Sequence, residues 1–137
     1  MTFRIIDGVA WIGDRAFPYA EVDVTDSPYH TADLEMKIRR MRIPAENGWT
    51  ISVIWGSMTY SDNHDHPSGG LWGKKVEWHE ESKTAEIRIW NREQRDALVN
   101  NVEGYLSTEV VLLLIDLMAT WASDADPQLD LQEILRG

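Results

Sequence analysis

Apolar and polar residues alternate along much of the first 90 residues, which predicts β-strands. In residues 20–24, apolar and charged side chains follow each other in turn, a pattern typical of a strand with one face in water. Residues 49–60 alternate too, but the phase changes at Gly56. A glycine at such a point indicates a β-bulge or a close approach of another backbone segment. Asp7-Gly8 between two apolar runs predicts a hairpin turn.

Residues 34–43 fit two kinds of secondary structure. Leu34, Ile38 and Met41 have helical spacing, whereas Leu34, Met36 and Ile38 have strand spacing. We favour a strand, because a turn sequence at 44–48 leads directly into the next predicted strand.

A second hairpin is predicted from cross-strand pairing. If Val76 pairs with Ile89, the same register opposes Trp78 to Ile87 and places opposite charges together on the other face.

From residue 91 onward the pattern becomes helical. Asn91 can cap a first helix with Gly104 as its stop, and Ser107 or Thr108 can cap a second. Asp126-Pro127 is typical of a third helix start. The expected helices span about residues 92–103, 108–122 and 127–135.

Strands followed by helices predict an α+β fold in one domain, residues 1–137. We expect an antiparallel β-sheet of about five to six strands within residues 3–90, packed by the C-terminal helices.

Composition limits the function classes. The chain has a formal net charge of −10 and no cysteine, which argues against direct nucleic-acid binding and against disulfides or thiolate metal sites. No apolar stretch has the length of a membrane span and the N-terminus does not resemble a secretory signal. We therefore expect a cytoplasmic protein that binds neither membrane nor nucleic acid and needs no cofactor, with homo-oligomerisation left open.

The densest polar cluster offers a weak metal site. His64 and His66, with Asp62, are chemically competent ligands of zinc. The favoured interpretation of residues 61–66 is instead a solvated turn in which Asp and Asn side chains bond to local backbone.

Charged residues suggest three further hypotheses. In the basic cluster at 37–42, a strand would place Arg40 and Arg42 on one face, where internal salt bridges are favoured over a nucleic-acid track. Asp116 interrupts an apolar helix, so it either lies on an exposed stripe, pairs with an arginine or marks a pocket. Residues 96–137 contain eight carboxylates and one basic residue, Arg136, which indicates either a solubilising face or a docking surface for a basic partner.

Residues 51–63 (ISVIWGSMTYSDN) and 86–90 (EIRIW) resemble segments of small uncharacterised proteins of actinobacteriophages. The resemblance covers about a third of the chain and transfers no catalytic residues. It implies a phage or prophage setting and a location in the host cytoplasm.

Together these features predict a non-enzymatic, phage-encoded binding protein that acts on a host or defence protein with a basic surface. The candidate contacts are aromatic and acidic side chains, since tyrosine and tryptophan are favoured interface anchors; they are Tyr60, Asp62, Trp72, Asp124, Asp126 and Asp130. Alternatives are an immunity-type inhibitor of a basic toxin, a minor virion component and, last, a small metal-dependent hydrolase.

Overall fold

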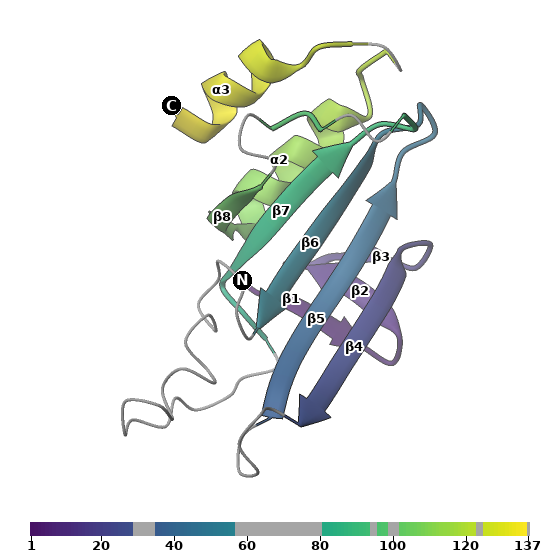
Figure 1. The fold of residues 1–137 in the computed structure, drawn as a ribbon, viewed down its shortest axis with the longest axis vertical. Helices are drawn as coiled ribbons and strands as arrows, with labels where there is room; N and C mark the ends of the chain where they lie inside the picture. Colours follow the sequence, from purple (N-terminus) through teal and green to yellow (C-terminus); the bar gives the residue numbers. More distant parts are fainter. Residues whose placement is uncertain (29–34, 57–80, 94–95, 99–101, 123–124, 137) are drawn as a thin grey trace.

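A computed structural model describes residues 1–28, 35–56, 81–93, 96–98, 102–122 and 125–136. These residues form a three-stranded and a five-stranded antiparallel sheet with two C-terminal helices (Figure 1). The α+β class predicted from the sequence is confirmed, although the strands divide between two sheets instead of one. Among these residues, no helix is long and apolar enough to cross a membrane.

The small sheet is built from the first 17 residues. Its strands are β1 (Phe3–Ile6), β2 (Val9–Ile12) and β3 (Arg15–Phe17), paired in that order. Asp7 and Gly8 join β1 to β2 with positive φ angles of 51° and 78°. Such angles are typical of a tight hairpin turn, which confirms the predicted turn.

The five strands of the large sheet lie side by side in chain order, and every neighbouring pair is antiparallel. In the segment at 34–43, whose sequence fits both a helix and a strand, the described residues 35–43 form a strand. The five strands are β4 (Glu21–Pro28), β5 (Glu35–Pro44), β6 (Thr50–Gly56), β7 (Thr84–Trp90) and β8 (Glu103–Ser107).

The hydrophobic core lies between the large sheet and a second layer made of the small sheet and helix α2 (Thr108–Met118) (Figure 1). Along β7, Ala85, Ile87 and Ile89 are fully buried while the residues between them are only partly buried. The rings of Phe3 and Trp55 join the two layers, with centroids 5.9 Å apart. Alternation along the strands therefore gives the large sheet one core face and one open face.

Helix α2 follows β8 without a connecting loop. Ser107 is its N-cap, and the Ser107 hydroxyl accepts a hydrogen bond from the backbone N–H of Val110. Hydrogen bonding to a backbone N–H at the start of the helix keeps the pKa of Glu109 below its usual range. Helix α3 (Gln128–Arg136) follows and packs against α2.

Two local predictions need correction. The helix expected at 92–103 is wrong, because Glu103 begins β8 and Asp96 forms an isolated β-bridge with Trp90. The predicted strand at 76–79 lies outside the described residues, and Ile87 has Val53 and Glu103 as its neighbours. Strand β7 therefore lies inside the sheet between β6 and β8, not in a local hairpin.

Candidate binding site on the open sheet face

The face of the large sheet opposite the core carries charged and polar side chains. In Figure 1 this face is turned toward the viewer, with the small sheet and α2 behind it. Antiparallel pairing aligns its side chains in rows across the strands. One row contains Glu21, Arg42, Ser52 and Arg88, each on a different strand from β4 to β7.

A second row lies beside the first. It contains Asp23, Arg40, Ile54 and Glu86, in the same strand order. Beyond the first row, toward the end of β7, Trp90 pairs with Thr50. Successive rows on one face are two residues apart, or about 6.8 Å along a strand.

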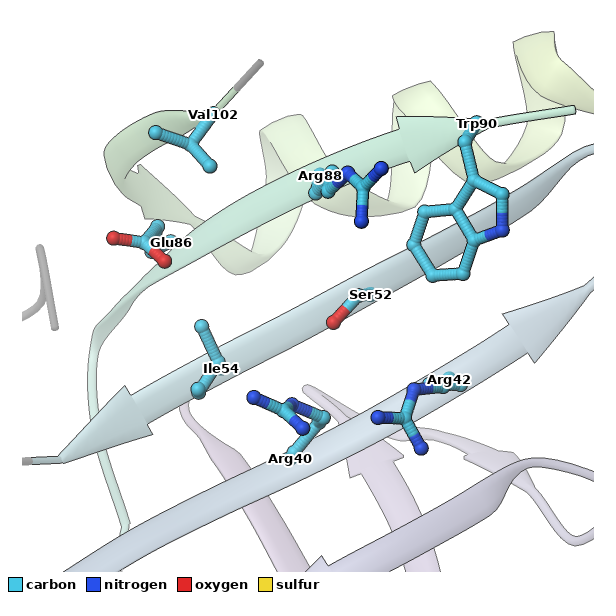
Figure 2. Close-up of a pocket in the computed structure, with 8 residues that line it drawn as sticks. All are labelled: Arg40, Arg42, Ser52, Ile54, Glu86, Arg88, Trp90 and Val102. Carbon is cyan, nitrogen blue, oxygen red and sulfur yellow. The ribbon is translucent and has the colours of Figure 1, made fainter. Parts of the chain in front are cut away.

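These rows surround a hollow of about 380 Å³. Its centre is Ser52, whose short side chain stands between the long side chains of Arg42 and Arg88 (Figure 2). The full lining is Arg40, Arg42, Ser52, Ile54, Glu86, Arg88, Trp90 and Val102. A small residue between two arginines leaves the space that a ligand would occupy.

Ion pairs hold two of the three guanidinium groups. Nη1 of Arg42 lies 3.4 Å from Oε1 of Glu21 and 3.2 Å from Oδ2 of Asp23. Nε of Arg88 donates a 2.6 Å hydrogen bond to Oδ1 of Asp96. Each pair engages one nitrogen, and a guanidinium has five N–H donors, so further donors remain on both arginines.

The third arginine and the serine have no such partners. Within the described part of the chain, the guanidinium of Arg40 forms no ion pair, and the Ser52 hydroxyl forms no hydrogen bond. Ser52 is only 9% exposed. Its hydroxyl oxygen is open to the hollow, so it can donate or accept a hydrogen bond with a small ligand there.

A larger cleft of about 810 Å³ lies at the other side of the large sheet, between α2, the start of β3 and the turn after β5. Two of its three charged residues pair with each other, since Nη1 of Arg15 lies 2.9 Å from Oδ1 of Asp116. The amide of Asn47 is also engaged, because its Nδ2 donates to two carbonyl oxygens. Asp116 is thus exposed, paired and at the edge of a cleft, so the three alternatives considered for it coexist.

Comparison of the chain with protein-family models, with curated proteins and with solved structures found no match. The functional assignment therefore depends on the geometry of the site alone.

Only two of the six residues predicted as contacts belong to the part of the chain that the structure describes. Asp126 is exposed shortly before α3, and Asp130 belongs to α3. Tyr60, Asp62, Trp72 and Asp124 lie outside the described residues, as do the proposed metal ligands His64 and His66. In the part of the chain that the structure describes, no three metal-ligating side chains come together.

Sequence reasoning recognised part of the hollow and missed the rest. Arg40 and Arg42 share a face, as expected for a strand, and Arg42 forms the expected internal salt bridges. Arg88 and Trp90 were not connected to them, because the predicted register paired β7 with residues 76–79. An arginine and a tryptophan at alternate positions of an amphipathic strand are the signal that could have identified this face.

Proposed function

We propose that this protein is a non-enzymatic binding protein that holds an anionic group on the open face of the large sheet. The observation that carries the proposal is the hollow in which Arg40, Arg42 and Arg88 surround the unpartnered hydroxyl of Ser52. Arginine presents N–H donors in a planar fork that matches carboxylate and phosphate oxygens.

Nearby carboxylates limit what kind of anion fits. Glu21, Asp23 and Asp96 pair with two of the arginines, and Glu86 lines the hollow. The surface as a whole is therefore not a positive field that would attract a polyanion. It favours a compact anion that enters the hollow and accepts hydrogen bonds directly from Arg40 and from the remaining donors of Arg42 and Arg88.

Titration with pyrophosphate tests this function. The Arg40→Gln variant is expected to bind pyrophosphate about 10- to 150-fold more weakly than the wild-type protein, measured by isothermal titration calorimetry at low ionic strength. The reason is that a hydrogen bond from a charged donor contributes about 1.5–3 kcal/mol. Ser52→Leu, which fills the centre of the hollow without changing charge, is expected to abolish binding.

The matched control is Arg15→Gln. This variant removes the same charge from an exposed ion pair beside the other cleft, so its affinity for pyrophosphate should stay within about twofold of wild type. Equal losses in the Arg40 and Arg15 variants would mean that only long-range charge matters. That result, or no binding by the wild-type protein, would refute the proposal.

A second candidate function is docking of a basic protein partner, as expected for a phage protein that acts on a host or defence protein. Exposed carboxylates favour it, because Glu109, Asp116, Asp126 and Glu133 all lie in the last 30 residues.

Charge neutralisation tests the second candidate. Asp126→Asn combined with Glu133→Gln should weaken capture of a basic host protein severalfold, and added salt should weaken the wild-type complex too. Asp7→Asn, which neutralises an exposed carboxylate in the β1–β2 turn, serves as the control. Capture that is indifferent to both the double substitution and salt would exclude acidic docking.

A further inference from the structure

Trp90 extends the anion site with an aromatic surface. It is the last residue of β7 and lines the hollow on the same face as Arg88, two residues earlier. Figure 2 shows its indole close to face-on in a view onto the sheet, so one ring face points away from the strands. The guanidinium carbon of Arg88 lies 5.0 Å from the centroid of the Trp90 ring, which fixes the ring beside the arginines.

The spacing of these groups defines the ligand. The Trp90–Thr50 pair lies one row from Arg42 and Arg88 and two rows from Arg40, or about 7 and 14 Å along the strands. A ligand that contacted both Trp90 and the arginines would place a planar ring over Trp90 and an anionic group between the arginines. The distance between the two is about the length of a sugar. Bases stack on tryptophan irrespective of their identity because every base has a π-face.

We infer that the ligand is a free nucleoside phosphate, with its base on Trp90 and its phosphate held by Arg40, Arg42 and Arg88. The inference rests on the proposed anion-binding function and names the ligand class of the same site. The hollow of about 380 Å³ lies within the range of small-molecule sites, about 300–1,000 Å³. A free nucleotide is favoured over a nucleic-acid strand because the chain carries a net charge of −10, which opposes the approach of a polyanion.

The test compares adenosine 5′-monophosphate with ribose 5-phosphate by titration calorimetry. Wild-type protein is expected to bind the nucleotide about tenfold more tightly than the sugar phosphate, owing to stacking. In Trp90→Leu this advantage of the nucleotide over ribose 5-phosphate should disappear, because the base loses the ring on which it stacks. Trp90→Phe, which keeps a smaller ring, should retain part of the advantage, and thermal melting would show that both variants fold.

Trp11→Leu is the matched control, since Trp11 forms a similar pair with Arg4, at 5.2 Å, in the small sheet. Its affinity for the nucleotide should equal that of wild type. Equal binding of both probes, unaffected by Trp90→Leu, would overturn the inference while leaving the anion-binding function intact. A short single-stranded oligonucleotide that binds more than tenfold tighter than the mononucleotide would overturn the assignment to a free nucleotide. If neither phosphate binds, both proposals fail.

Discussion

Replacing Gly56 with alanine is expected to lower the free energy of unfolding by about 3–5 kcal/mol, because two costs add at this position. Gly56 ends β6 with a φ of +118°, which residues with a Cβ rarely adopt. It is also opposite Ile38 of β5, and an added Cβ would collide with the carbonyl oxygen of Lys37. Backbone atoms in a paired strand cannot move away without breaking the pairing. Urea denaturation monitored by tryptophan fluorescence measures the change.

Gly8→Ala separates the two costs. Gly8 also has a positive φ, of +78°, but an added Cβ would have no atom within 4 Å. Backbone strain alone should therefore cost about 1–2 kcal/mol there. If the two variants lose equal stability, the close approach between β5 and β6 contributes nothing, and the explanation given for Gly56 is wrong.

Gly56 is also an example of a feature of the sheet that could be predicted from the sequence. A glycine where strand alternation changes phase predicted either a bulge or a close backbone approach, and the contact with Lys37 is such an approach. Alternation likewise predicted β6, the turn sequence at 44–48 favoured a strand for β5, and Ser107 was one of the two predicted caps of α2. These features depend on local conformation and on which face of a strand is buried, and both leave a pattern in nearby residues.

The failed prediction at 92–103 depended on a signal with two meanings. The sequence predicts Asn91 as a helix cap, and its Oδ1 does accept a hydrogen bond from the backbone N–H of Glu93. Here that contact stabilises a turn, because Asn and Asp close turns by the same bond with which they cap helices. Pairing of β8 with the edge of β7 then decides the conformation of residues 103–107, and tertiary contacts override local propensity.

The binding site was less predictable than the fold for a related reason. Arg42 and Arg88 lie on either side of Ser52 only because β5 and β7 both pair with β6. That arrangement depends on strand order and register, which residues far apart in the chain determine together. The sequence therefore indicated which face each arginine occupies and not which arginines meet.

Asn47→Ala is expected to lower the free energy of unfolding by about 2 kcal/mol, because Asn47 joins the β5–β6 turn to the end of α2. Its Nδ2 donates to the carbonyl oxygens of Met118, at 2.8 Å, and Trp121, at 2.7 Å. Its Oδ1 accepts a hydrogen bond from the backbone N–H of Trp49 at 3.3 Å. Removing the amide leaves partly buried backbone groups without a partner, which costs about 1–3 kcal/mol. Thermal and urea denaturation measure the loss.

The Asn47→Asp variant shows whether Asn47 stabilises the protein through its hydrogen bonds to the end of α2 or only through the conformation of its own turn. Aspartate keeps the Oδ1 acceptor for Trp49, but it replaces the donor with a negative charge beside two carbonyl oxygens. It should therefore be at least as destabilising as alanine at pH 7, and protonation of the new carboxyl at low pH should recover part of the difference. A stable Asn47→Asp protein would mean that Asn47 acts only within its own turn. The neighbouring hydrogen bond from Trp49 Nε1 to the Ala122 carbonyl, 2.8 Å long, would then be the main polar tie between the turn and the helix end.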